Sequence, residues 1–223
     1  EIGVRLVGSE MCIRDRLPSR EWKRSVRNLP WYPGDSVNIG IGQGDVLVTP
    51  LQLATAVAIL ANRGRMVTPH LLRDAELSLR PNVDIPDDAW RVISDAMQDV
   101  IHRGRRGLGE NGTAWAYIGM DIPYRAAGKS GTAQVVGIAQ GEEYDDAELD
   151  ERLRKHAWFV AYAPAEEPQI AVAVLVENGG GGSEVAAPVA RKVLDYQMIG
   201  NSAIAQRSEH QEPTFARAGA YLD

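Results

Sequence analysis

The stretch Gly128-Lys129-Ser130-Gly131-Thr132-Ala133-Gln134 lies within a predicted β-strand that covers residues 126–136. Residues two positions apart in a strand share a face, so Ser130 and Thr132 would present two hydroxyl groups on one side. Gly131 has no side chain, which lets the backbone of a bound molecule approach closely. An edge strand can also accept an extended peptide through main-chain hydrogen bonds. The stretch therefore predicts a strand suited to a peptide that carries a carboxylate.

Two more strands are predicted downstream, at residues 157–163 and 169–177. Residues 170–176 are apolar on both faces, which is typical of a central strand that is covered on both sides. The charged residues 142–155 between the first two strands are expected to form a solvated helix or excursion. The glycines of residues 179–182 predict a flexible hinge.

Helices are predicted on both sides of these strands in the sequence. The Thr49-Pro50 pair opens one as N-cap and first helical residue, and residues 51–61 are apolar on nearly every face, so this helix is expected to be buried. Residues 87–102 repeat apolar side chains at helical spacing and predict a half-exposed amphipathic helix. Another amphipathic helix, residues 186–198, closes the pattern. Strands followed by a terminal helix indicate an α+β domain, an antiparallel sheet flanked by helices.

Turn-forming residues surround the first of these helices. Residues 30–35 predict a rigid turn, anchored by Trp31 and Tyr32 in preference to a groove lined by them. The glycines of residues 39–44 predict a loop with unusual backbone angles or close backbone approach. Gly64 fits a helix C-cap.

Periodic patterning begins at Leu17 and ends near residue 200. Residues 1–16 resemble a translated sequencing adaptor, with a polar surface loop as the alternative; in the first case Cys12 is foreign to the natural protein. Residues 17–200 are assigned to the C-terminal part of one domain. The polar, aperiodic residues 201–223 are predicted to be a disordered tail.

Composition excludes several classes of protein. The net charge of -6 and the pI near 5.3 do not suggest a nucleic-acid or membrane-surface footprint. One cysteine cannot form an intrachain disulfide. No apolar run approaches the roughly 18–20 residues that span a bilayer. The histidines lack metal-ligand spacing and are predicted to be surface or capping residues: His70, His102, His156 and His210.

Lys129-Ser130-Gly131-Thr132 resembles the third motif of serine penicillin-binding proteins and β-lactamases. Judged alone, these four residues favour an ordinary strand start with a bulge. Seven segments in matching order, however, resemble one subfamily, penicillin-binding protein 2, the class B transpeptidase of cell elongation. These segments are residues 17–23, 31–35, 40–44, 49–53, 129–135, 159–164 and 176–179. As an ordered set covering roughly residues 17–198, they make the resemblance specific.

The resemblance implies the penicillin-binding-protein/β-lactamase-like transpeptidase fold and a serine acyl transfer. A serine would attack a D-Ala-D-Ala bond of a peptidoglycan stem peptide, an amine would resolve the acyl-enzyme, and β-lactams would acylate the same serine. Lys129 would act near the catalytic proton path, and the Thr132 N–H would be one of two oxyanion-hole donors. The residues that would bind the substrate or β-lactam are Ser130, Gly131, Thr132 and Ala133.

The resemblance also implies a place and partners for the parent protein. It would lie on the periplasmic face of the bacterial inner membrane, held by an anchor outside these residues. It would work with a glycosyltransferase of the elongation machinery, would not bind nucleic acid, and would need no cofactor or catalytic metal.

The nucleophile of this family sits in Ser-x-x-Lys, where the lysine can deprotonate the serine, and no Ser-x-x-Lys occurs in the 223 residues. Ser36-Val37-Asn38 fits the second family motif, Ser-x-Asn, literally. We reject this match because it lies within the stretch that follows the true second motif in the family. We therefore expect a fragment with one wall of an active site, inactive by itself.

Two alternatives stay open from the sequence. A β-lactamase or β-lactam sensor would use the same sheet, and a degenerate module would bind peptidoglycan or partner proteins without turnover. We also expect exposed apolar surface around residues 51–60 and a poorly soluble or molten product when these residues are expressed alone.

Overall fold

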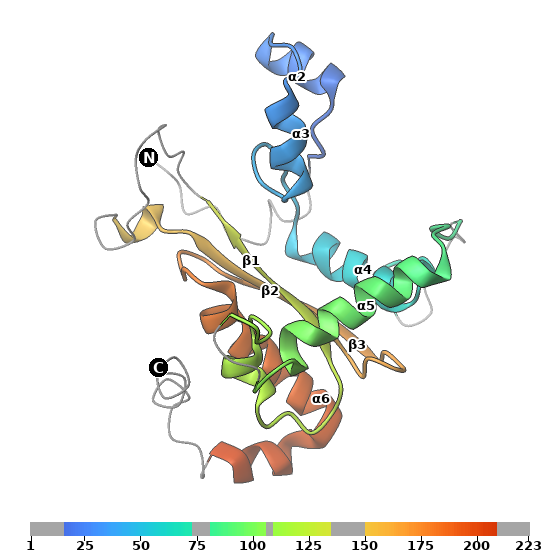
Figure 1. Ribbon diagram of the computed structural model, residues 1–223, viewed down its shortest axis with the longest axis vertical. Helices are drawn as coiled ribbons and strands as arrows, with labels where there is room; N and C mark the ends of the chain where they lie inside the picture. The colour runs from blue at the N-terminus through green and yellow to red at the C-terminus, as the bar shows by residue number, and fades with distance from the viewer. Residues whose placement is uncertain (1–15, 73–80, 106–108, 135–149, 209–223) are drawn as a thin grey trace. The chain divides into compact units, whose positions relative to one another are not determined.

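The structure, a computed structural model, describes residues 16–72, 81–105, 109–134 and 150–208, with only the backbone described at 201–208. The chain divides into two compact units, the first ending at Leu53 and the second beginning at Ala54 (Figure 1). The predictions for Cys12, His210 and most of residues 142–155 fall outside the described residues.

Among its described residues, the first unit contains two short helices that precede α4, and α2 (Arg20–Arg27) is the earlier of them. The Ser19 hydroxyl oxygen accepts the Trp22 N–H at 3.1 Å, which caps the first turn of the helix. Asn28 ends the helix in the left-handed conformation with φ of 53°, a role that asparagine tolerates well.

The second helix of this unit, α3 (Pro33–Gly40), occupies the place of the turn predicted for residues 30–35. Pro33 is the first helical residue, where its missing N–H costs no hydrogen bond. Asp35 Oδ2 accepts the Tyr32 N–H at 2.7 Å as half of a capping box. The turn prediction was wrong beyond Pro33, because proline and glycine are tolerated at the start of a helix.

The α4 helix (Pro50–Ala61) begins where the Thr49-Pro50 pair predicts. Thr49 Oγ1 accepts the Gln52 N–H at 3.1 Å, and Gln52 Oε1 accepts the Thr49 N–H at 2.9 Å. Val57 alone is buried in this helix, so the burial expected for residues 51–61 is not seen within the described chain. The exposed apolar surface expected around residues 51–60 agrees with this finding.

The C-terminus of α4 uses two left-handed residues. Arg63 has φ of 51° and Gly64 has φ of 82°, and the Gly64 N–H donates to the Ile59 carbonyl at 2.9 Å. This is the hydrogen bond of a Schellman motif. The left-handed C′ residue is therefore Arg63, one position before the predicted glycine cap, and Gly64 follows it as C″.

The α5 helix (Asp87–His102) has the predicted boundaries. Trp90 and Ile101 are buried, whereas Val92 and Ile93 are exposed. The apolar face predicted from the sequence is therefore wider than the face that packs within the described residues.

Three antiparallel strands form the sheet in the order β1 (Ala127–Ala133), β2 (His156–Ala163) and β3 (Ile170–Val176). All three strands were predicted. The central strand of the described sheet is β2, and β3 pairs with β2 among the described residues, so the central place predicted for residues 170–176 stays a prediction. Strand order depends on pairing between distant segments, which apolar patterning alone does not encode.

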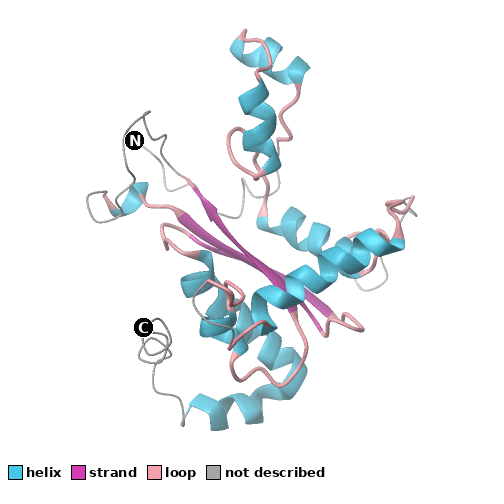
Figure 2. Ribbon diagram, in the orientation of Figure 1, coloured by secondary structure: helices cyan, strands magenta, loops and turns pink. Residues whose placement is uncertain are grey.

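Helices cover both faces of this sheet (Figure 2). On one face, small fully buried residues such as Ala157, Ala161 and Ala190 surround Phe159 and Leu194. Their size lets helix α6 (Ala187–Ser208) come close to the strands, and the π-helical turn η1 (Trp115–Gly119) packs against α5 and α6. On the other face, a smaller cluster centres on buried side chains of α4, β1 and β2: Val57, Ala127 and Tyr162.

Two predictions near the C-terminus need correction. Gly182 is not a free hinge, because it is buried at the start of the π-helical turn η3 (Gly182–Ala186). The α6 helix continues through Ser208 with a break at Gly200, where φ is 75°, so the backbone at 201–208 is helical where a disordered tail was predicted for residues 201–223, and residues 209–223 lie outside the described residues. The short turn η2 (Glu151–Leu153) is what the structure describes of the charged excursion.

The second unit thus has the predicted α+β architecture, an antiparallel sheet flanked by helices. Within the residues that the structure describes, none of the helices combines the length and the apolar character needed to cross a membrane.

Candidate functional site

The two faces of β1 carry different parts of the motif. The strand register pairs Lys129 with Val160 and Gly131 with Trp158, and these residues share one face. Ser130 and Thr132 lie on the opposite face, across from two buried residues of β2: Phe159 and Ala157. The two hydroxyls predicted to share a face therefore do so.

The backbone of β1 alternates between its partner strand and its outer edge, as in any antiparallel ladder. The Ala126 N–H, just before the strand, donates to His102 Nε2 on α5 at 3.0 Å and so points away from β2. The Ser130 carbonyl accepts from the Lys129 ammonium at 2.6 Å, which again marks the outer edge. Thr132 lies two residues beyond Ser130, so the same alternation directs its N–H to this outer edge.

The Lys129 ammonium and the Ser130 hydroxyl come together across this edge. Although their Cβ atoms lie on opposite faces, Lys129 Nζ reaches within 3.4 Å of Ser130 Oγ. Lys129 and Thr132 are exposed, and Gly131 between them would place a Cβ only 3.3 Å from Trp158 Cβ. The arrangement offers an anionic ligand a cation, hydroxyl groups and backbone donors along one edge.

The beginning of β1 is held by His102, whose role the sequence predicted only as capping or surface. Burial lowers the pKa of His102, and the nearby Arg125 guanidinium lowers it further. A neutral imidazole is also what the Ala126 N–H needs as its acceptor. The capping prediction is confirmed for His102, because it caps the first N–H of the motif strand.

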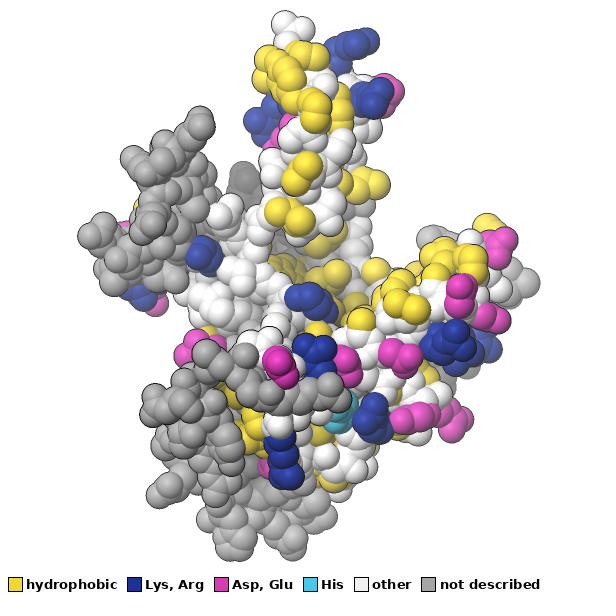
Figure 3. All heavy atoms as spheres, viewed as in Figure 1, with side chains coloured by type: hydrophobic (Ala, Val, Ile, Leu, Met, Phe, Trp, Pro, Cys, Tyr) yellow, Lys and Arg dark blue, Asp and Glu magenta, His cyan; other side chains and the backbone are white. Residues whose placement is uncertain are grey.

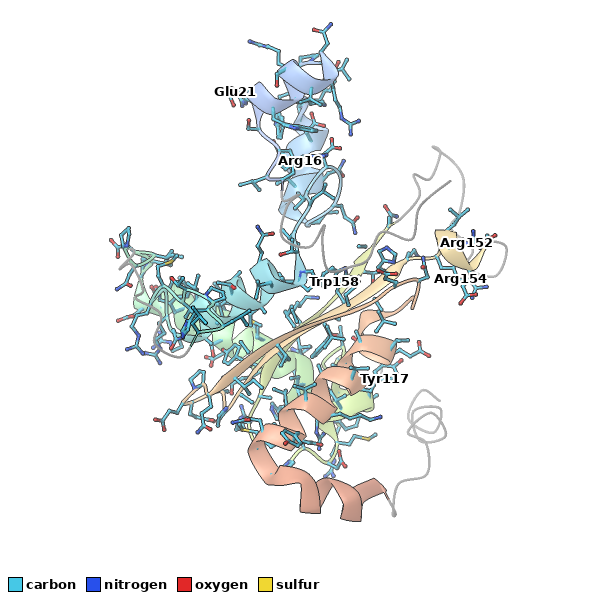
Figure 4. All side chains as sticks on the ribbon, turned by 180° about the vertical axis from the view of Figure 1, so that it is seen from behind. Arg16, Glu21, Tyr117, Arg152, Arg154 and Trp158 are labelled. Atoms are coloured by element: carbon cyan, nitrogen blue, oxygen red, sulfur yellow. The ribbon has the colours of Figure 1, made fainter. Side chains whose placement is uncertain are left out.

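His156 makes a similar bond at the start of β2. Its Nδ1 accepts the Asn178 N–H at 2.9 Å. The Asn178 amide donates in turn to the carbonyls of Arg152 and Arg154, which fixes the turn that precedes β2. Figure 4 shows these two arginines at this turn, with Trp158 farther along β2. The capping prediction is thus confirmed for His156 too.

Two glycines, Gly128 and Gly182, lie where a side chain would clash with atoms of β1 or β2. A Cβ on Gly128 would lie 2.9 Å from Phe159 Cζ and from the Val160 carbonyl oxygen. A Cβ on Gly182 would overlap the carbonyl oxygens of Gly131 and Trp158 and lie 3.0 Å from Gly131 N. The contact of Gly182 was not predicted, and the run of glycines at residues 179–182 is its only signal in the sequence.

The literal Ser-x-Asn match belongs to the first unit and not to the strand edge. Ser36 lies on α3, where its hydroxyl accepts from Trp31 Nε1 at 2.9 Å. Tyr32 lies under the Lys23 ammonium, with 4.6 Å between Nζ and the ring centroid. Trp31 therefore anchors the start of a helix, as the sequence predicted for a turn.

Two hollows in the described part of the second unit lie away from this edge. One, of about 340 Å³, lies beside Tyr124, Pro164 and Met198. The other, of about 200 Å³, lies beside Trp90, Ser94 and Tyr162. The described residues include no cluster of three acidic, histidine or cysteine side chains that could hold a metal ion.

Comparisons with known proteins point to one family. The family model for the penicillin binding protein transpeptidase domain matches residues 17–195. Peptidoglycan D,D-transpeptidase MrdA of Haemophilus influenzae is 41% identical over 88% of the chain, and MrdA of Acinetobacter baumannii is 42% identical over 82%. The chain spans 30% and 27% of the lengths of these two relatives.

Solved structures give the same result. Pseudomonas aeruginosa PBP2, solved in complex with WCK 5153, matches 83% of the chain at 42% identity with a TM-score of 0.68, and the match covers 38% of that protein. Helicobacter pylori PBP2, solved in complex with MreC, matches 83% of the chain at 27% identity with a TM-score of 0.67, and the match covers 31% of that protein.

Proposed function

The chain belongs to the penicillin-binding protein transpeptidase family, and on this premise we propose that it forms one wall of the active site of a peptidoglycan D,D-transpeptidase. The observation that carries the proposal is the outer edge of β1. There the Lys129 ammonium lies within 3.4 Å of the Ser130 hydroxyl, and the Thr132 N–H points outward.

Each residue of this edge has a proposed role. Lys129 holds positive charge beside the proton path, and the hydroxyls of Ser130 and Thr132 bind the carboxylate of the stem peptide or β-lactam. Gly131 and Ala133 leave room for the ligand to lie along the strand as an added strand. The Thr132 N–H donates to the oxyanion, an interaction worth about 3 kcal/mol when one such donor is removed from other serine enzymes.

In the proposed reaction, a serine hydroxyl attacks the carbonyl carbon between two D-alanines of a stem peptide. The serine proton passes through a base to the departing D-alanine amine as the peptide bond breaks. An amine of a second stem peptide then attacks the acyl-enzyme, forms the cross-link and releases the serine. The Ser-x-x-Lys serine is not among these 223 residues, so another part of a longer protein would supply it.

We place this longer protein at the periplasmic face of the inner membrane, with β-lactams as its inhibitors and a glycosyltransferase of cell elongation as its partner. The two MrdA relatives, which are named as peptidoglycan D,D-transpeptidases, support the peptidoglycan substrate, and the location and the glycosyltransferase partner rest on the family resemblance.

Acylation by a fluorescent penicillin tests the proposal. The 223-residue chain and a version extended to the length of the relatives are each incubated with the reagent and separated by denaturing electrophoresis. We expect only the extended protein to be labelled, and we expect the label to disappear when its Ser-x-x-Lys serine is replaced by alanine.

Two other results would contradict the proposal. Labelling of the 223-residue chain that is lost in S36A would make Ser36 a nucleophile. Absence of label on both proteins would favour a binding module without turnover.

A further inference from the structure

Gly182 lies directly behind the motif strand, although it is 51 positions away from Gly131 in the sequence. It is buried at the first position of η3, and that turn packs against both β1 and β2. A Cβ at this position would overlap the carbonyl oxygens of Gly131 and Trp158. The absence of a side chain therefore sets how closely η3 can approach the two strands.

The Gly131 carbonyl belongs to the same planar peptide unit as the Thr132 N–H. Because the unit is rigid, a displacement of its oxygen also displaces its N–H on the other side. Gly182 thus contacts, from behind, the peptide group whose front carries the proposed oxyanion donor. Trp158, on the central strand, is paired with Gly131 and is touched by the same glycine.

We infer that Gly182 is a positioning residue for acyl transfer. Resting on the proposed function, this inference assigns to Gly182 the task of holding the Gly131–Thr132 peptide in the orientation that aims the Thr132 N–H at the oxyanion. A shift of about 1 Å in a catalytic group can cost 10²-fold in rate. A methyl group at position 182 forces a shift of this kind, because the atoms it meets are backbone atoms on both strands.

The neighbouring glycine provides a matched control. A Cβ on Gly181 would meet only the Glu184 side chain, at 3.7 Å, and the φ of Gly181 is -82°, which alanine adopts readily. G181A and G182A therefore add the same methyl group at adjacent positions. Only the second methyl is directed at the motif strand.

The test uses the extended protein and measures penicillin acylation as two parameters, the dissociation constant of the initial complex and the acylation rate constant. For G182A we expect an acylation rate constant about 10²-fold lower, with an initial dissociation constant changed less than about threefold. G181A should match the wild type in both parameters. If G182A were simply unfolded, a smaller fraction of the protein would be labelled, and the folded remainder would react at the wild-type rate.

A peptide boronic acid supplies a second readout, because its tetrahedral adduct places an oxygen in the oxyanion hole. G182A should bind it more weakly by about the same factor as the loss in acylation rate. If G182A does not fold, A186G decides: it removes a fully buried methyl of η3 and should lower the acylation rate constant several-fold without adding atoms.

An unchanged acylation rate constant in folded G182A, or in A186G where G182A is unfolded, would overturn the inference while leaving the proposed function intact. A wild-type extended protein that no penicillin acylates would overturn the proposed function, and with it the inference.

Discussion

Apolar side chains are buried in the sheet of the second unit, whereas several are exposed on the helices of the first unit. Phe159 on β2 is fully buried, and the alanines around it have no exposed surface. In the first unit, Val26 on α2 is 64% exposed and Val37 on α3 is 65% exposed. Figure 3 shows hydrophobic side chains gathered on the surface of these helices.

This difference separates two sources of order. The helices of the first unit are specified locally, by a Ser19 cap on α2 and by a proline start and a capping box on α3. The sheet is specified by burial of apolar area, which contributes roughly 25 cal/mol per Å² and requires several elements at once. Local signals can thus define a helix whose apolar side chains remain exposed, whereas a strand such as β2 requires its neighbours.

The largest expected effect is a difference in the free energy of unfolding between two side-chain truncations, one in the sheet and one in the first unit. F159A should lower the free energy of unfolding by about 3–5 kcal/mol, since it removes a fully buried aromatic ring. V26A should change it by less than about 0.5 kcal/mol, because the side chain is exposed. Urea unfolding of the extended protein, followed by near-ultraviolet circular dichroism, measures both.

Equal midpoints for the two variants would break the comparison, since they would show that the core around Phe159 is not packed in solution. A large loss in V26A would show instead that α2 is covered by other residues of the chain.

Sequence signals predicted most elements of the fold for physical reasons that can be named. The periodicity of residues 87–102 and the Thr49 cap gave the limits of α5 and the start of α4, because both signals lie within a few residues of the feature. The place of β2 between β1 and β3 in the described sheet was not predicted, because an apolar strand reads the same whether or not it has two neighbours.

The Thr132 N–H is the proposed oxyanion donor at the outer edge of β1. T132P removes the outward N–H of Thr132, and proline is compatible with an edge position whose N–H does not face a neighbouring strand. We expect acylation of the extended protein by penicillin to slow about 10²–10³-fold, as when one oxyanion donor is lost elsewhere. Stopped-flow fluorescence of the labelled penicillin gives the rate.

T132V is the control, because it removes the hydroxyl and keeps the N–H. It should weaken binding of the penicillin carboxylate with a smaller change in the acylation rate constant. If T132P folds and is acylated as fast as T132V, the N–H of Thr132 is not the oxyanion donor.

The sequence predicted the motif residues of the candidate site, but it did not predict the residues from other elements that contact the motif strand. Lys129 to Thr132 form a contiguous motif, so their association needed no knowledge of the fold. His102 and Gly182 reach the same strand from α5 and η3, 24 positions from Ala126 and 51 from Gly131. Such contacts depend on how helices pack on the sheet, and neither a lone histidine nor a glycine run specifies that packing.

The smallest expected effect concerns the pH dependence of the strand's first hydrogen bond. His102 accepts the Ala126 N–H only when its Nε2 is unprotonated, and burial lowers the pKa of His102 below its ordinary value of about 6.5. As the pH falls below this value, the unfolded chain takes up a proton that the folded chain resists. Stability therefore falls with pH by at most about 1.4 kcal/mol per pH unit for one group.

H102Q should flatten this slope between about pH 6.5 and 5, because the glutamine oxygen can accept the same N–H and does not titrate in that range. The control is H70Q, which replaces an exposed histidine that bonds to the Thr68 carbonyl and leaves the Ala126 hydrogen bond intact, so its slope should match that of the wild type. Urea midpoints of the three proteins at several pH values give the slopes. If the wild type and H102Q have the same slope, His102 takes up its proton as readily in the folded chain as in the unfolded chain, and the bond from the Ala126 N–H does not keep it neutral.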